Sequence, residues 1–384
     1  MIAPTGYSIS DYGEMIVCEP RMSTYVEALK QAVTPGCTVI DIGAGFGVFA
    51  LLACKFGAES VVAIETDSSI ELLHELAQAN GFTDRITIVR DLSTNFTPEK
   101  KADVIISDLR GTVPLYESHI PTIMDARERL LADGGKLLPQ RDNLRIAMVH
   151  AADAYRPAAA PWSPSKFGID LSAGRRFAIN DSSKEYLKPD TFVSDPVELT
   201  TLDYRTISDP NIDCTVELTA SHDSEANGLL IWFDAEIADG LTYSNCPGEP
   251  ELVYGQMFLP LSEPIQFKRG ETMRARIRAM LLGADYTWNW DCEVRDPGTG
   301  AVRHTFRQST FLREVHVPAE LQNGSNLRVP EKTAQMDIDR DFLDLVGEGR
   351  SLGDIAEALS KKHTAQLPTV EQALDHVANI MRRY

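Results

Sequence analysis

The sequence predicts an α/β domain with a parallel sheet, then an antiparallel β domain, then a small helical unit. Over residues 1–141, short apolar runs alternate with amphipathic helical stretches, which is typical of a parallel sheet. Over residues 142–330, β-rich runs are separated by turn residues, which indicates an antiparallel barrel or sandwich. Over residues 331–384, the apolar residues return to helical spacing and predict three helices.

Length and composition bound the class of protein. A chain of 384 residues is longer than one ordinary core requires, which supports more than one domain. Its 43% hydrophobic and 24% charged residues are typical of a globular protein in water. It has no run of 18 apolar residues and no signal-peptide pattern, so we expect no membrane partner. Its six cysteines lack metal-ligand spacing, which indicates a reducing cytoplasm and no metal site.

The net charge is −19, from 37 basic and 56 acidic residues. This excess of acid argues against a nucleic-acid partner, because affinity for a phosphate backbone comes from lysine and arginine. Two interpretations of the charge remain open at this point. It steers cationic substrates toward the protein, or it serves only solubility.

A glycine-rich turn between a strand and a helix organises the first domain. The apolar strand carries Asp41 near its end, and Gly43, Gly45 and Gly47 follow at alternate positions before the next helix. Glycines allow a tight turn and close approach of the backbone to a ligand, and the helix N-terminus offers free N–H groups. The alternative is a glycine-rich turn that binds nothing.

An acid ends the second predicted strand. Glu65 follows Ser60–Ile64 directly, at the place where a carboxylate can accept both hydroxyls of a ribose. Asp41 suits a cationic or hydroxyl-rich ligand better than a pyrophosphate. Together these residues resemble the motif of the S-adenosylmethionine (SAM) methyltransferases, which implies SAM as cofactor and S-adenosylhomocysteine as product.

The turn after the third predicted strand, Ile86–Val89, is the next candidate contact. In folds of this kind that turn faces the adenine, which makes Ser93 and Thr94 candidates for contact with the ring. An ordinary polar turn is the other interpretation, and the sequence does not decide between them.

Two acids follow the fourth predicted strand, Ala102–Ser107. Asp108 and Glu117 are separated by nine residues, on a loop that contains Gly111 and Pro114. Paired carboxylates match the fork of donors on a guanidinium, so these acids can form a clamp. Alternatively, Asp108 caps a turn and Glu117 caps the next helix, where an acid is also favourable.

Three other segments are informative, and two of them have two interpretations each. The aromatic and charged segment from Tyr7 folds over a cofactor as a lid, or it caps a sheet edge. The stretch Arg156–Asp195, rich in proline, serine and charge, predicts an excursion from the β domain. The C-terminal helices, with a capping box at Ser351 and Asp354, form a brace or a partner-recognition module.

The order of lid, glycine motif, acid, double-acid loop and β domain resembles the protein arginine N-methyltransferases over about residues 7–320. The resemblance implies a seven-stranded Rossmann-like domain, a β-barrel, and a homodimer through an arm at about residues 157–190. It implies catalytic roles for Asp108 and Glu117. The implied cofactor-binding residues are Tyr12, Arg21, Asp41, Gly43, Gly45, Gly47, Glu65, Ser93 and Thr94, and the implied substrate-binding residues are Tyr7, Tyr254 and Gln256.

Two departures from the family pattern concern the substrate. The first clamp acid is Asp108 where the family has glutamate, and a shorter side chain shifts a bound guanidinium by about 1 Å. The barrel loop reads Leu252-Val253-Tyr254, without the family's histidine. The sequence therefore looks more like bacterial relatives, with a free amino acid, small metabolite or peptide as substrate. The helical tail is faintly similar to winged-helix peptide-binding modules.

The leading hypothesis is transfer of a methyl group from SAM to a guanidinium nitrogen of a cationic acceptor. One alternative is methylation of another nitrogen or oxygen in a small molecule, with Asp108 or Glu117 as a lone base. The other is a catalytically silent methyltransferase fold kept for binding or dimerisation.

Replacement of Glu117 by glutamine is expected to collapse turnover while SAM binding persists, because the clamp loses one carboxylate and the cofactor residues are unchanged. Methyl-transfer rates and calorimetric SAM affinity measure the two effects. Full activity of the Glu117→Gln enzyme on its true substrate would contradict the clamp.

Overall fold

The computed structural model describes residues 7–162, 167–317 and 329–381. The chain divides into two compact units, Met1–Val315 and His316–Tyr384. The first unit therefore contains both the parallel and the antiparallel regions predicted from the sequence. Among the described residues, no helix has both the length and the apolar character needed to cross a bilayer.

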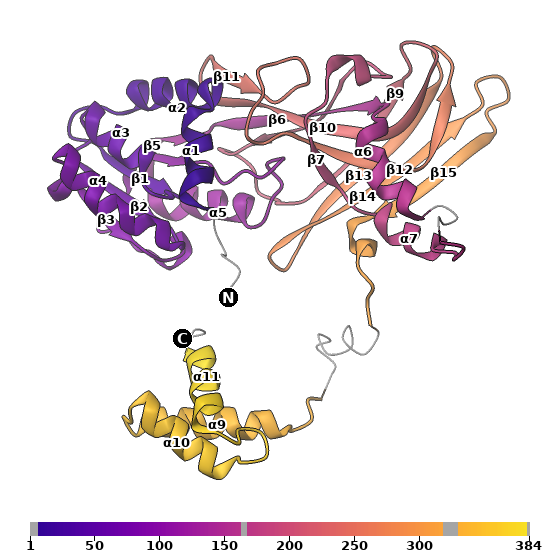
Figure 1. Ribbon diagram of the computed structural model, residues 1–384. Coiled ribbons are helices and arrows are strands. Elements are labelled where there is room, and N and C mark those ends of the chain that lie inside the picture. The colour runs from indigo at the N-terminus through magenta and orange to yellow at the C-terminus, as the bar shows by residue number, and fades with distance from the viewer. Residues whose placement is uncertain (1–6, 163–166, 318–328, 382–384) are drawn as a thin grey trace. The chain divides into compact units, whose positions relative to one another are not determined.

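A five-stranded parallel sheet forms the first part of this unit (Figure 1). Its order is β3-β2-β1-β4-β5, and the order reverses between β1 and β4. Ligands of such sheets bind at the carboxyl ends of the strands beside the reversal. The strands are β1 (Thr38–Ile42), β2 (Ser60–Ile64), β3 (Ile86–Val89), β4 (Ala102–Ser107) and β5 (Leu131–Leu138).

The parallel α/β fold is confirmed, but the expected count of seven strands is wrong for the described sheet. After β5 the chain enters β6 (Arg141–Val149), which pairs antiparallel with β8 and β10. The hydrogen bonds of β6 are therefore used in the next sheet, and the parallel sheet receives no further strand from it.

Helices alternate with these parallel strands. Apolar spacing in α3 buries Ala50, Ala53 and Cys54, and this helix packs on β1 and β2. The predicted helix from Ser69 begins with a 3₁₀ turn, Ser68–Glu71, that Asp67 caps by accepting the Ser69 N–H. The helices are α1 (Ile9–Val17), α2 (Glu19–Ala32), α3 (Val48–Phe56), α4 (Leu72–Asn80) and α5 (His119–Asp125).

Two antiparallel sheets make up the predicted β domain (Figure 1). One has the order β7-β12-β10-β6-β8, with β11 beside β10, and the other has the order β15-β14-β13-β9. The further strands are β7 (Ser183–Glu185), β8 (Val197–Asp203), β9 (Ile212–Thr219), β10 (Ser224–Ala238), β11 (Leu241–Ser244), β12 (Gln256–Phe267), β13 (Thr272–Leu282), β14 (Asp285–Arg295) and β15 (Val302–Ser309).

Alternation of side chains explains the antiparallel sheets. In β13, Arg274 and Arg276 point outward, while Ala275 and Ile277 lie in a core shared with the parallel sheet. Strands β7, β8, β11 and β15 are not predicted from the sequence, because they are short or rich in threonine and charge. Between β6 and β8 lie α6 (Ala152–Ala159), which begins before the predicted excursion at Arg156, and α7 (Arg175–Ala178), which lies within it.

The second unit consists of α9 (Ala334–Gly347), α10 (Leu352–Lys362) and α11 (Val370–Met381). The three predicted helices and the Ser351 cap are confirmed, since Ser351 Oγ accepts the Asp354 N–H at 3.2 Å. This unit has a hydrophobic core of its own, with Phe342 and Leu359 at its centre.

Replacement of Phe342 by alanine is expected to lower the stability of this helical unit by about 3–5 kcal/mol, because Phe342 is 1% exposed and fills its core. Calorimetry of the full chain should show loss of one thermal transition while the main transition stays in place. Replacement of Leu343, which is 47% exposed, is the matched control and should change little. Equal effects of the two substitutions would contradict this packing.

Candidate active site

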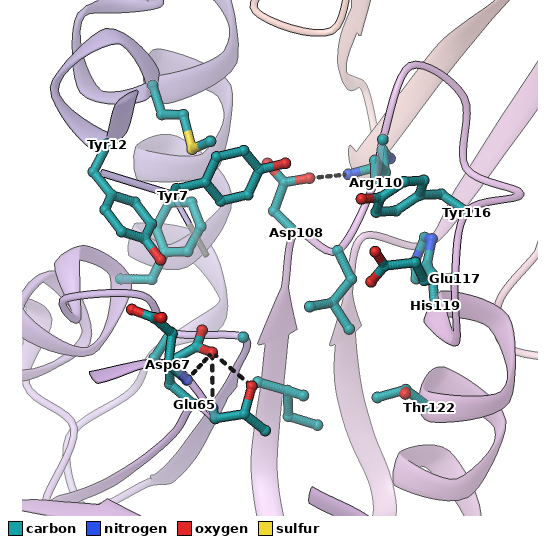
Figure 2. A pocket seen from close by; sticks show the side chains of 18 of the residues that line it. Tyr7, Tyr12, Glu65, Asp67, Asp108, Arg110, Tyr116, Glu117, His119 and Thr122 are labelled. Atoms are coloured by element: carbon teal, nitrogen blue, oxygen red, sulfur yellow. Dashed lines mark hydrogen bonds and ion pairs between the residues drawn. The ribbon is translucent and has the colours of Figure 1, made fainter. Parts of the chain in front are cut away.

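A cavity of about 840 Å³ opens at the carboxyl ends of the parallel strands. It receives residues from the N-terminal segment, the glycine turn, the end of β2, the loop after β4 and the antiparallel region (Figure 2). Nine of the predicted site residues line it: Tyr7, Tyr12, Arg21, Gly43, Glu65, Ser93, Asp108, Glu117 and Tyr254.

The glycine turn is left-handed and tightly covered. Gly43 and Gly45 have backbone φ values of 70° and 55°, which residues other than glycine rarely adopt. A Cβ on Gly45 would lie 2.6 Å from the Tyr12 ring. The Tyr12 hydroxyl lies 3.2 Å from Ser69 Oγ, so the N-terminal segment is fastened over the turn.

Glu65 lies at the end of β2 and faces the cavity. Its Oε1 accepts the Thr66 hydroxyl and the N–H groups of Thr66 and Asp67 (Figure 2). Its Oε2 accepts the Gly45 N–H at 3.0 Å. These bonds fix the carboxylate next to the glycine turn. Because Oε2 accepts one N–H and a carboxylate oxygen has about two acceptor positions, one position on Oε2 remains for a hydroxyl donor.

Asp41 lies beneath the turn and outside the cavity lining. It is fully buried, its Oδ2 accepts the Ala50 N–H at 3.0 Å, and its Oδ1 has no partner among the described atoms. Burial raises the pKa of this carboxyl to about 7, and nearby Glu65 adds to the shift. Asp41 therefore holds the first turn of α3 and does not face a ligand directly.

Asp108 is the buried acid of the loop after β4. Its Oδ2 accepts Arg21 Nε at 2.6 Å and the Tyr254 hydroxyl at 2.5 Å, and its Oδ1 accepts Arg110 Nη1 at 3.1 Å. Burial alone would raise the pKa of this carboxyl, but Arg21 and Arg110 hold the pKa below its usual range. Asp108 is therefore an ionised carboxylate at neutral pH.

Glu117 is the exposed acid of the same loop. Its side chain faces the cavity near Tyr116 (Figure 2), and its N–H is bonded to Asp285 Oδ1 at 3.0 Å. Glu117 has φ 41°, the only positive value for a non-glycine residue in the described ranges. Helix α5 has Ser118 at its N-cap without a side-chain cap, so Glu117 is not the helix cap of the alternative interpretation.

Comparison with known proteins finds similarity to methyltransferases over both the parallel and the antiparallel regions. A family model for ribosomal protein L11 methyltransferase matches residues 21–128, and one for the arginine methyltransferase oligomerization subdomain matches residues 140–290, together more than half of the chain. The arginine N(omega)-methyltransferase of Streptomyces achromogenes subsp. streptozoticus is 29% identical over 265 residues, 67% of this chain and 72% of that protein. The chain is a SAM-dependent methyltransferase that is similar to the arginine methyltransferases.

Two solved arginine methyltransferase structures have the same fold as this chain. The protein arginine methyltransferase 1 enzyme–prozyme heterotetrameric complex of Trypanosoma brucei with AdoHcy has a TM-score of 0.71 at 22% identity, over 78% of this chain and 96% of that chain. Protein arginine methyltransferase 10 of Arabidopsis thaliana, in an open conformation, has a TM-score of 0.69 at 20% identity, over 79% and 97%.

The cavity of this methyltransferase suits SAM chemically. Glu65 can accept a ribose hydroxyl, and the backbone at Gly43 approaches without a side chain. In the described chain, hydrogen bonds of Arg21 use Nε and Nη1, which leaves Nη2 as a donor for a carboxylate. Ser93 lines the far end of the cavity, next to the exposed Leu92.

Four predicted residues besides Asp41 lie outside the cavity lining: Gly45, Gly47, Thr94 and Gln256. Gly45 donates its N–H to Glu65, and Gly47 is the N-cap residue of α3. Gln256 is a correction, because its amide is used within the antiparallel region: Oε1 accepts the Leu187 N–H and Nε2 donates to the Asn245 carbonyl. It is 6% exposed and therefore supports the fold where we expected a substrate contact.

A buried network behind Asp108 is not predicted from the sequence. Arg110 donates from Nε and Nη2 to both carboxylate oxygens of Asp142, at 2.7 and 2.8 Å, and from Nη1 to the Tyr25 hydroxyl. The Tyr204 hydroxyl also donates to Asp142. Of these residues, only Arg110 could have been found from the sequence, because it lies two residues after Asp108. Asp142 and Tyr204 are distant from that loop in the sequence.

His119 packs beside this network and is neutral. Its Nδ1 donates to the Pro114 carbonyl at 2.9 Å, and its ring lies against Tyr204. Burial and the Arg110 charge lower the pKa of His119 to about 4. The imidazole therefore braces the loop between Asp108 and Glu117 without adding charge.

The free energy of unfolding is expected to fall as pH drops from about 6.5 to about 4, since unfolded chains protonate His119 and folded ones do not. The loss attributable to His119 is about 3 kcal/mol, from a depression of about two and a half pKa units. Denaturant titrations of the wild type and His119→Asn across this range measure it, because asparagine keeps a donor for Pro114. Parallel pH profiles for the two proteins would contradict the assignment.

Proposed function

We propose that this enzyme transfers the methyl group of SAM to a guanidinium nitrogen of a small molecule or peptide. One observation carries the proposal: Asp108 and Glu117 line the same cavity as Gly43 and Glu65. The acids that suit a guanidinium and the residues that suit the cofactor therefore share one space. The relatives that match this chain are named for arginine methylation, which supports the same acceptor class.

The distribution of charge around the acceptor end favours a cation. Arg21 is paired with Asp108, and Arg110 is paired with Asp142, so these four buried charges balance. Glu117 has no cationic partner within 4 Å among the described residues. A monocationic acceptor beside Glu117 would restore neutrality in a partly enclosed site.

Asp108 can take part although it is already bonded. Its three hydrogen bonds from Arg21, Arg110 and Tyr254 use three of about four acceptor positions, which leaves one on Oδ1. In the proposed clamp, Asp108 accepts one N–H of the acceptor and Glu117 accepts others. The shorter side chain of Asp108 is thus offset by its fixed position, because Arg21, Arg110 and Tyr254 hold its carboxylate.

The chemistry of the donor needs little from the protein. SAM supplies a methyl group on a positively charged sulfur, which is already a reactive electrophile. The residues of this chain bind, orient and exclude water. In this proposal Glu65 holds the ribose, Arg21 binds the carboxylate through Nη2, and Tyr7 and Tyr12 cover the cavity. Glu117 accepts the proton that the methylated nitrogen loses.

A second candidate is supported by the unequal state of the two acids. Asp108 is buried and bonded to two arginines, so Glu117 is the acid with freedom to act as a lone base. This arrangement also fits transfer to a nitrogen or oxygen of a small molecule without a guanidinium. The two candidates differ in whether the acceptor needs more than one N–H donor.

We also propose a homodimer that forms through the arm at about residues 157–190. The oligomerization subdomain match covers this segment, and Phe167 and Ile169 on it are 81% and 58% exposed. Sedimentation velocity that shows a monomer would contradict this. A cytoplasmic location remains part of the proposal, supported by six cysteines that are all free.

A labelled-methyl panel tests the acceptor. Wild-type enzyme with labelled SAM should methylate guanidino compounds and leave the matched amines lysine and cadaverine unlabelled, because an ammonium cannot bridge two acids as a planar fork does. The guanidino set is free arginine, agmatine and an arginine peptide. Agmatine lacks the carboxylate of arginine, so their comparison reports whether an amino-acid head group is recognised.

Two results would contradict the proposal. Labelling of amines or hydroxyl compounds at rates equal to those of guanidino compounds would favour the lone-base candidate. Failure of SAM to bind in calorimetry would favour a silent scaffold.

A further inference from the structure

The hairpin between β13 and β14 reaches the acid loop of the parallel domain. Asp285, the first residue of β14, accepts the Glu117 N–H through Oδ1 at 3.0 Å, although the two residues are 168 positions apart. The antiparallel region thus contributes a direct hydrogen bond to the backbone of the exposed acid in the proposed site.

The accepting oxygen is itself held in place. Asp285 Oδ1 also accepts the Tyr286 N–H at 2.7 Å, and the Tyr286 hydroxyl donates to the Pro210 carbonyl at 2.8 Å. Tyr286 is 7% exposed, so this anchor is packed into the sheet. Across the turn, Asp285 pairs with Leu282, and Gly283 has the positive φ of 69° that the turn requires.

Glu117 needs such a contact more than other residues of its loop. Its φ of 41° is unfavourable for a side chain with a Cβ, and such conformations persist only where the surroundings fix them. On the loop's other side, His119 Nδ1 donates to the Pro114 carbonyl, and the His119 N–H donates to the Tyr116 carbonyl. The hydrogen bond to Asp285 therefore fixes the loop from outside, in addition to the two hydrogen bonds of His119 within the loop.

We propose that Asp285 is a positioning residue that sets the direction of the Glu117 side chain toward the acceptor. The inference rests on the proposed function, since it gives Glu117 its role in acceptor binding. Asp285 acts through one oxygen as a hydrogen-bond acceptor, and its charge is not required. Asparagine at this position keeps that oxygen, whereas alanine removes it.

The test compares Asp285→Ala, Asp285→Asn and a matched control on the guanidino acceptor that the wild type methylates fastest. We expect kcat to fall about tenfold to a hundredfold in Asp285→Ala, because small misplacements at a reacting centre are costly. SAM affinity should stay within about twofold, and Asp285→Asn should restore kcat to within about threefold of the wild type, from the retained acceptor.

The control is Asp296→Ala. Asp296 lies in the next hairpin, where its Oδ1 accepts the N–H groups of Gly298 and Thr299 in its own turn and does not bond to the acid loop. This substitution removes an equivalent turn contact and should leave kcat unchanged. An equal loss of kcat in Asp285→Asn or in Asp296→Ala would overturn the positioning role.

Hydrogen exchange gives a readout that needs no acceptor. The Glu117 amide should exchange at least about tenfold faster in Asp285→Ala than in the wild type, and at the wild-type rate in Asp285→Asn, because only alanine frees the N–H. Equal exchange in all three proteins would overturn the inference. If the wild type methylates no guanidino compound, the acceptor class has failed, and the exchange comparison still decides whether Asp285 holds Glu117.

Discussion

The candidate site depends on a network of buried charges that runs from Arg21 through Asp108 and Arg110 to Asp142. Each arginine is paired with an acid at 2.6–2.7 Å, and the side chains of Arg110 and Asp142 are fully buried. Removing one member of such a pair leaves an uncompensated charge and costs about 3–5 kcal/mol. These ion pairs also connect three parts of the first unit, because Arg21 lies on α2, Asp108 follows β4, and Asp142 lies on β6. The same ion pairs therefore join the two regions and hold the residues of the cavity in place.

This network gives the two acids of the loop different tasks. Asp108 is held by donors from the chain itself and has an ionised, fixed carboxylate. Glu117 is exposed and has an unusual backbone conformation. In the proposed clamp, the rigid acid would define where the cationic acceptor lies, and the free acid would adapt to the shape of that acceptor.

The sequence was sufficient for features that depend on local pattern. Apolar runs located β2, β3 and β4 at their observed bounds, and spacing placed Glu65 and Asp108 beside one cavity. The sequence was insufficient where a residue's structure or role depends on a partner that is distant in the chain. Strand β15 is rich in charge and exists because β14 pairs with it, and Gln256 is used by Leu187 and Asn245. The bonds of Asp108 to Tyr254 and of Arg110 to Asp142 likewise join residues that no spacing rule relates.

The position of Tyr254 has a consequence for redesign of the acceptor range. Its hydroxyl bonds to both Arg21 and Asp108, so this residue of the antiparallel region supports the ion pair beneath the cavity. A substitution at Asp108 leaves the buried Arg21 without its acid, and a substitution at Tyr254 removes one hydrogen bond from that ion pair, so libraries at these two positions would lose stability. Diversity directed at Tyr7, Tyr116 and Lys184, which border the same cavity and carry no paired buried charge, leaves this ion pair intact. A search for new acceptors should therefore begin with substitutions at these three residues that border the cavity.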